Sequence, residues 1–197
     1  MCLLGLLVDR GWSPLLRWDR WFGAQVVELG ASQRWLQTAA DTLGMATRDV
    51  GSAAVVLVAV ALLWQHHQRA AQWLAASAII GFAVQNAVKA LVGRARPVWP
   101  GSPFHLATPA FPSGHAMSGI DMWVVLGLLM VLAPLGRPAR WVGALVIAVG
   151  VLMGPSRLIL GVHWSSDVLA GWLLGAAAAC AAAALVGWRA NVAAARP

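Results

Sequence analysis

The chain has 197 residues, of which 60% are hydrophobic and 11% are charged. With a mean hydropathy of +0.72, this composition excludes an ordinary soluble globular protein, in which about a quarter of the residues are charged. The formal net charge of +7 does not indicate nucleic-acid binding, because the basic residues lie in short gaps between apolar runs and form no single basic face.

Residues 1–46 are predicted to form an N-terminal amphipathic region that lies at the membrane interface. Apolar residues recur there at helical spacing, which predicts one amphipathic helix or a bent pair of helices over 12–46. Four tryptophans in this region favour an interfacial position: Trp12, Trp18, Trp21 and Trp35. The alternative is a sixth span near 14–32, whose polar residues would be costly at mid-bilayer.

Five later segments approach or reach the roughly 20 apolar residues that a spanning helix needs. They are 47–64, 71–92, 115–133, 139–160 and 167–188. The connections are short except for 93–114, which is rich in glycine, proline and serine. The expected fold is therefore all-α: a polytopic transmembrane helical bundle of five clear spans, possibly six. Residues 47–188 form its transmembrane domain, and 189–197 form a cytoplasmic tail.

The basic residues predict the orientation of the bundle. Under the five-span arrangement one side carries Arg69, Arg137, Arg140, Arg189 and Arg196, and the positive-inside rule makes that side cytoplasmic. The other side carries Lys89, Arg94, Arg96 and Arg157. Cations on the side that should be poor in them need a reason other than topology.

Three sequence clusters fall on that outer side. The first is Lys89-x6-Arg96-Pro97, the second is "PSGH" at 112–115, and the third is Ser156-Arg157-x5-His163-x3-Asp167. Because the spans run up and down between them, these clusters can converge at one membrane surface.

The chemistry of the clusters indicates an oxyanion site. Lys89, Arg96 and Arg157 supply cations without a carboxylate close in sequence, which suits phosphate. Ser113 and Gly114 stand where a loop becomes a helix, so backbone N–H groups favour an anion there, and His115 would lie in the first helical turn.

His163 and Asp167 are four residues apart, so a helical turn would stack them on one face. A carboxylate on one ring nitrogen makes the other nitrogen a better nucleophile. Each cluster alone also has a structural interpretation: Lys89 as an interfacial anchor, "PSGH" as a helix cap, and the His–Asp pair as a helix contact. Their combination on one side favours a functional site.

These three clusters resemble the signature of the type 2 phosphatidic acid phosphatase family, the lipid phosphate phosphatases, with no signature position substituted. The resemblance covers about 47–188 and implies a helical bundle, a metal-independent reaction and a covalent phosphohistidine. It implies His163 as nucleophile, Asp167 as its orienting partner and His115 as general acid. The phosphate-binding residues would be Lys89, Arg96, Ser113, Gly114 and Arg157. The family usually has six spans, which leaves the topology of the N-terminal region open.

Three polar residues outside the signature have no single interpretation. Arg94 could contact a headgroup or a diphosphate, or it could anchor the loop at the interface. His105 is expected to be a solvated loop residue or a substrate contact. Asp121, six residues into the third span, could face the substrate cleft or bond Gln85 or Asn86, and the structural bond is slightly favoured. No cofactor or metal is expected.

The main hypothesis is a phosphatase of the bacterial cytoplasmic membrane that acts on a lipid phosphate or diphosphate at the periplasmic or exterior face. Its partners would be the lipid substrate and membrane lipids, and the oligomeric state is left open. One alternative is a phosphotransferase that passes the phosphoryl group to another acceptor, and a weaker one is an anionic-lipid transporter. Polyprenyl diphosphate, phosphatidylglycerophosphate and phosphatidate all fit the same clusters.

Overall fold

The computed structural model describes residues 3–47, 51–65, 67–100, 104, 106–134 and 136–187, which form helices joined by turns and loops. The helices are α1 (Leu3–Asp9), α2 (Ser13–Ser32), α3 (Arg34–Met45), α4 (Gly51–Trp64), α5 (Gln68–Val92), α6 (Gly114–Ser118), the π-helical segment η2 (Gly119–Val124), α7 (Val125–Leu132), α8 (Arg137–Ile159) and α9 (Ser165–Leu185). The predicted all-α fold is confirmed. The predicted tail at 189–197 and His105 lie outside the described residues.

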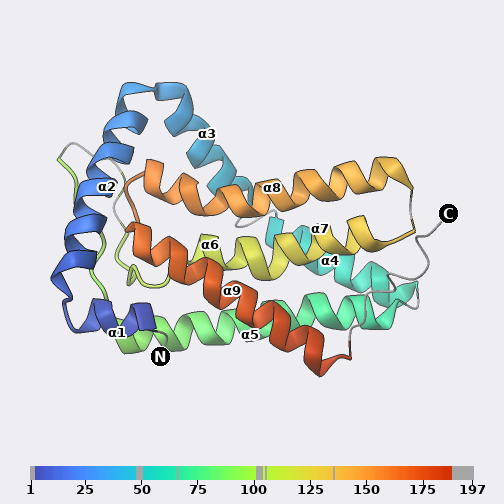
Figure 1. Cartoon of the computed structure of the whole chain (residues 1–197). Helices are drawn as coiled ribbons and strands as arrows, with labels where there is room; N and C mark the ends of the chain where they lie inside the picture. Colours follow the sequence, from blue (N-terminus) through green and yellow to red (C-terminus); the bar gives the residue numbers. More distant parts are fainter. Residues whose placement is uncertain are drawn as a thin grey trace.

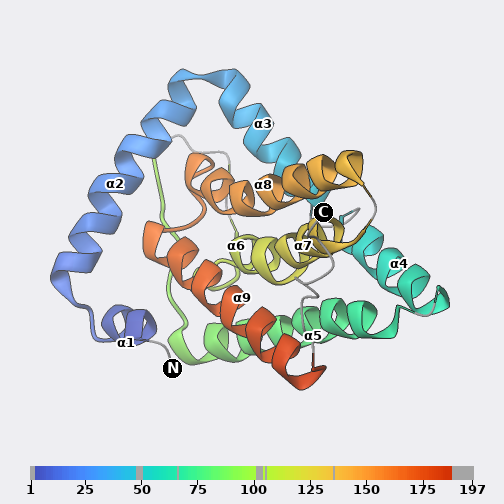
Figure 2. The same cartoon turned by 45° about the vertical axis from the view of Figure 1, so that its right-hand side comes forward.

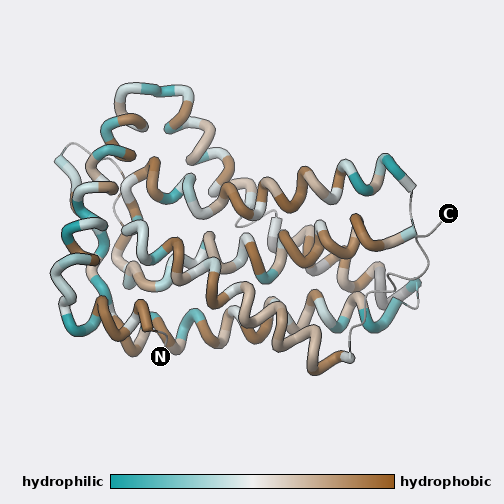
Figure 3. Tube along the Cα trace, viewed as in Figure 1, coloured by the Kyte–Doolittle hydropathy of each residue, from teal (hydrophilic) through white to brown (hydrophobic). Residues whose placement is uncertain are grey.

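Four stretches of the described chain are long and apolar enough to cross a membrane: α5, α6 through α7, α8 and α9. They run along one another in Figures 1 and 2, and Figure 3 shows hydrophobic residues along much of their length. They confirm four of the five predicted spans. The remaining one, expected at 47–64, corresponds to α4, whose 14 residues rise about 21 Å, less than the roughly 30 Å of bilayer hydrocarbon.

Glycines allow these helices to approach closely. A Cβ added at Gly143 of α8 would lie 2.7 Å from the carbonyl oxygen of Gly127 on α7, and one added at Gly171 of α9 would lie 2.6 Å from the carbonyl oxygen of Ser113. Small residues at such contacts are typical of membrane helices, where close van der Waals packing replaces the hydrophobic effect. The contact at Gly171 holds the start of α6 against α9.

The N-terminal region is a bent pair of amphipathic helices, α2 and α3, with the bend at Gln33. Helix α2 lies across one end of the long helices and contacts α8 and α9, while α3 returns along α8 (Figures 1 and 2). Large apolar side chains on this pair are exposed, including Trp18, Trp21 and Trp35. Helix α2 is not one of the four candidate spans, which favours the amphipathic pair over a sixth span at 14–32.

Two glycines in the left-handed region shape the chain at the end that α2 covers. Gly93, with φ +56°, ends α5, and the loop that carries Arg94 and Arg96 begins directly after it. Gly161, with φ +67°, lies in the turn between α8 and α9 that leads to His163. Glycine adopts this conformation without a steric penalty. All three sequence clusters therefore lie at this end of the bundle.

Candidate active site

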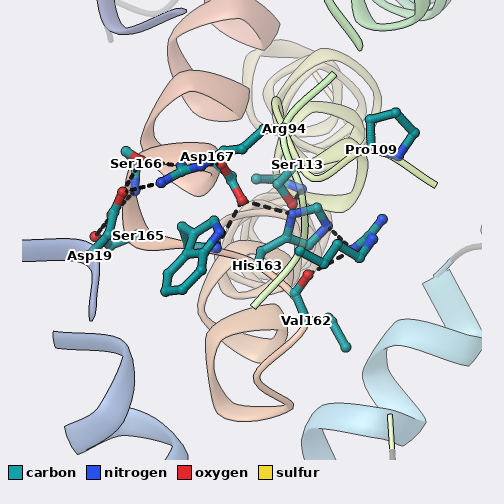
Figure 4. A network of polar contacts seen from close by, with 12 residues as sticks. Asp19, Arg94, Pro109, Ser113, Val162, His163, Ser165, Ser166 and Asp167 are labelled. Atoms are coloured by element: carbon teal, nitrogen blue, oxygen red, sulfur yellow. Dashed lines mark hydrogen bonds and ion pairs between the residues drawn. The ribbon is translucent and has the colours of Figure 1, made fainter. Parts of the chain in front are cut away.

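His163 and Asp167 meet at the start of α9. His163 lies in the turn before the helix and Asp167 in its first turn, so the pair does not stack on a helical face as the spacing suggested. The His163 Nδ1 atom is 3.4 Å from Asp167 Oδ2, and the same oxygen accepts a 2.8 Å hydrogen bond from the Trp164 N–H. The same carboxylate oxygen therefore caps the start of α9 and faces the imidazole of His163, as Figure 4 shows.

The other ring nitrogen of His163 faces a cation. Its Nε2 is 3.0 Å from Arg96 Nη1, and because a guanidinium can only donate, Nε2 must be the unprotonated nitrogen. Nδ1 then carries the hydrogen that points to Asp167. His163 is 4% exposed, and this burial lowers its pKa from 6.5 to about 4, against the opposing effect of the Asp167 carboxylate. The imidazole is therefore neutral at pH 7.

Lys89 and Arg96 are held by backbone carbonyl groups of the loop that follows α5. Lys89 Nζ donates to Pro109 O at 2.6 Å, and Arg96 donates from Nε to Thr108 O at 2.8 Å and from Nη1 to Val162 O at 2.7 Å. Neither is ion-paired with a carboxylate of the described residues. Burial lowers the pKa of Arg96, while the charge of Asp167 raises it. Their positive charge thus remains without a counter-ion in contact.

Ser113 and Gly114 join the second cluster to the third. Ser113 is the buried N-cap of α6; its N–H donates to Asp167 O at 3.0 Å and its Oγ accepts from the Ala116 N–H at 3.5 Å. A Cβ added at Gly114 would lie 2.8 Å from Gln85 Oε1 on α5, so the start of α6 packs directly against this side chain. The start of α6 therefore lies between α5 and α9. The sequence predicted the loop-to-helix junction at Ser113 and Gly114 but not this packing.

His115 and Arg157 both meet α3 at Gly44. The His115 Nε2 atom is 3.4 Å from Gly44 O, and Arg157 Nη2 donates to Ala40 O at 2.7 Å. A Cβ added at Gly44 would collide with the Arg157 guanidinium. Arg157 is buried and reaches across from the last turn of α8. The N-terminal pair of helices therefore forms one wall beside His115 and Arg157.

Arg94, which had no assigned role, forms the centre of a buried ionic network. Its Nη1 donates to Asp167 Oδ1 at 2.6 Å and its Nη2 to Asp19 Oδ2 at 2.7 Å (Figure 4). Asp19 of α2 also accepts bonds from Ser165 Oγ and from the N–H of Ser166. Neither interpretation of Arg94 from the sequence included this pairing with two carboxylates. It links Asp167 to the N-terminal helix.

Fold and site together define the class of this protein: a helical membrane protein with a His–Asp pair beside a lysine and an arginine that form no ion pair with a carboxylate in the part of the chain that the structure describes. The chain belongs to the PAP2 superfamily, whose model matches residues 70–191.

Relatives in the curated collections are similar over part of the chain. An undecaprenyl-diphosphatase of Sulfolobus acidocaldarius is 32% identical over 126 residues, which cover 61% of this chain and 57% of the relative. The phosphatidylglycerophosphatase B of Bacillus subtilis is 37% identical over 73 residues, 36% of each chain. A decaprenylphosphoryl-5-phosphoribose phosphatase of Mycobacterium tuberculosis is 34% identical over 55% of this chain and 58% of its own. The matches thus span less than two thirds of these relatives.

A solved structure shares the fold over nearly the whole chain. The crystal structure of a transmembrane PAP2-type phosphatidylglycerolphosphate phosphatase from Bacillus subtilis superposes with a TM-score of 0.76, covering 93% of this chain and 92% of that one at 20% identity. The helical membrane fold, including α2 and α3, is therefore shared with a known transmembrane protein.

Proposed function

We propose that this protein is a phosphatase that hydrolyses a lipid phosphate or diphosphate monoester through a phosphohistidine intermediate, without a metal, at the outer face of the cytoplasmic membrane. The carrying observation is the neutral His163, whose Nε2 lone pair faces Arg96 while its Nδ1–H faces Asp167. The names of the relatives, which are all phosphatases of lipid-linked phosphates, support the substrate class.

The first half of the proposed reaction transfers the phosphoryl group to His163. The lipid phosphate takes over the hydrogen bond that Arg96 makes to Nε2, so that the lone pair is released toward phosphorus. Nε2 forms the new P–N bond as the P–O bond to the leaving group breaks; the leaving group is the lipid alcohol of a monophosphate or the lipid monophosphate of a diphosphate. Asp167 stabilises the positive charge that develops on the imidazole, and Lys89 and Arg96 stabilise the charge on the phosphoryl oxygens.

His115 handles the protons. It donates one to the departing lipid oxygen in the first half, and in the second half it takes one from the water that attacks the phosphohistidine. Breaking the P–N bond then returns Nε2 to its neutral state and releases inorganic phosphate. The N–H groups at the start of α6, beginning at Gly114, are suited to hold the phosphoryl oxygens, and Arg157 adds a further cation beside His115.

The test is phosphate release from phosphatidate, phosphatidylglycerophosphate and undecaprenyl diphosphate by the purified protein in detergent, with and without EDTA. We expect activity that EDTA does not change and that His163→Ala abolishes. Substrate labelled on the terminal phosphate should leave an acid-labile, alkali-stable label on the wild-type chain and none on His163→Ala. The matched control is His67→Ala, at the exposed N-cap of α5 on the other end of that helix. A fully active His163→Ala protein would refute the mechanism.

A further inference from the structure

A cavity of about 330 Å³ opens beside the candidate site, between α5 and the helix that begins with α6. Gly114, His115 and Asp121 line it from the helix that runs from α6 into η2, and Gln85 lines it from α5. The remaining lining includes apolar side chains such as Phe82. The cavity therefore adjoins the start of α6 and has apolar side chains along part of its wall.

Asp121 is placed in this cavity by two local features. It lies in the π-helical segment η2, and such interruptions of an α-helix are frequent at functional sites. Opposite it, a Cβ added at Gly81 of α5 would collide with the Asp121 carboxyl group. The absence of a side chain at Gly81 thus leaves the space that the carboxyl group occupies.

The Asp121 carboxyl group has an unsatisfied atom. The residue is 3% exposed, and its Oδ1 atom is buried with no hydrogen-bond partner among the described residues. Asn86, one of the two partners considered from the sequence, donates instead to Phe82 O, and Gln85 lines the same cavity. The cleft interpretation of Asp121 is therefore favoured over the structural bond. A buried polar atom without a hydrogen-bond partner costs free energy. A ligand that supplies a partner for Oδ1 would therefore gain binding free energy.

We propose that this cavity binds the alcohol side of the substrate and that Asp121 bonds a free hydroxyl group on it. The preferred substrate is then the phosphomonoester of a hydroxyl-bearing headgroup, of the glycerol or sugar kind, and not phosphatidate or a polyprenyl diphosphate. A hydroxyl both donates and accepts, so it pairs with Asp121 whether the carboxyl group is ionised or protonated. This assignment rests on the proposed function, which places the departing oxygen at His115, on the wall of the same cavity.

The test compares two lipids that differ in one group: phosphatidylglycerophosphate and its analogue that lacks the free glycerol hydroxyl, both in detergent micelles. For the wild type we expect kcat/KM at least about tenfold larger for the hydroxyl lipid, the discrimination of one hydrogen bond to a buried polar group. Asp121→Ala should bring this ratio close to one and leave the analogue within about threefold of the wild-type rate. Asp121→Asn, which keeps a hydrogen-bonding group, should retain part of the preference.

Ser77→Ala is the matched control. Ser77 Oγ on α5, one turn from Gly81, is also buried and has no hydrogen-bond partner among the residues that the structure describes, but Ser77 does not line the cavity. Its removal should leave the ratio unchanged. Melting temperatures of all variants are measured in the same detergent, and if Asp121→Ala does not fold, the ratio for Asp121→Asn decides.

Three results would overturn the assignment: equal wild-type rates on the two lipids, an equal loss on both in Asp121→Ala, or faster turnover of a polyprenyl diphosphate than of the hydroxyl lipid. An effect of Asp121→Ala confined to transfer onto added free glycerol would also overturn it, because the hydroxyl would then belong to an acceptor. Failure of the proposed function looks different, since His163→Ala would then keep activity on every lipid.

Discussion

Replacing Arg94 by methionine removes the cation that lies between two buried carboxyl groups, those of Asp19 and Asp167. The Arg94 side chain is 9% exposed, and those of Asp19 and Asp167 are 1% and 0% exposed. Methionine has a similar length and packs in the same space without charge. Two carboxylates then remain buried, with hydroxyl and backbone N–H donors at Asp19 and the Trp164 N–H and His163 Nδ1–H at Asp167.

The expected loss of stability is large. Removing one partner of a buried ion pair costs about 3–5 kcal/mol, which corresponds to a fall in melting temperature of about 6–20 °C for a chain of this size. Adding Asp19→Asn to Arg94→Met removes one of the two unpaired carboxylates. The double variant should therefore melt at a higher temperature than the sum of the single effects predicts, with a coupling free energy of about 1–3 kcal/mol. Arg20→Met, at the exposed position beside Asp19, is the control and should melt like the wild type.

Kinetics separate this positioning role from direct contact with substrate. Arg94 holds Asp167 Oδ1, so its loss frees the carboxyl group that orients His163, and displacements of this kind lower kcat by about a hundredfold. KM should stay within about threefold, because Arg94 does not bind the phosphate. A raised KM with unchanged kcat would refute this assignment, and so would a melting temperature within 2 °C of the wild type.

Two further predictions concern pH and topology. Burial lowers the pKa of His163 from 6.5 to about 4, so between pH 6.5 and 4 the unfolded chain binds a proton that the folded chain does not, and stability falls as the pH decreases through this window. His163→Gln should weaken that fall in melting temperature, and an identical pH dependence would contradict the buried neutral imidazole. For topology, Leu106→Cys in a chain without Cys2 and Cys180 should react with a membrane-impermeant maleimide on intact cells, whereas Gln65→Cys, on the opposite side, should react only after lysis. The reverse labelling would place the site at the cytoplasmic face.

The sequence alone predicted four of the five helices expected to span the membrane, and it placed three clusters of candidate site residues at one end of the bundle. Apolar runs of about 20 residues are a direct consequence of bilayer thickness, so four spans could be located without any tertiary information. The loop-to-helix junction at Ser113 and Gly114 follows from local chain chemistry as well. The roles of these residues remain predictions, but their positions at one end of the bundle agree with the up-and-down path of the chain.

The tertiary contacts could not be predicted in the same way. Asp19 lies 75 residues before Arg94, on a helix that the sequence predicted only as part of an amphipathic region at the membrane interface. Only the docking of α2 across the ends of α8 and α9 buries it, and no local pattern encodes that docking. The spacing of His163 and Asp167 likewise suggested that both lie on one helical face. In the structure His163 lies before α9, in the turn that begins at Gly161, and only Asp167 lies in the helix.

The bond between Asp19 and Arg94 bears on how proteins of this kind exchange parts during evolution. All three motifs lie after residue 88, yet the network that anchors Asp167 closes through a helix that ends at residue 32. A gene recombined between these positions would keep every motif residue and receive a foreign N-terminal helix. Unless that helix also placed a carboxylate beside Arg94, the recombined protein would have every motif residue but would lack the ion pair on Arg94 that the Asp19 carboxylate makes. Helix α2 and the motifs are therefore expected to be inherited together.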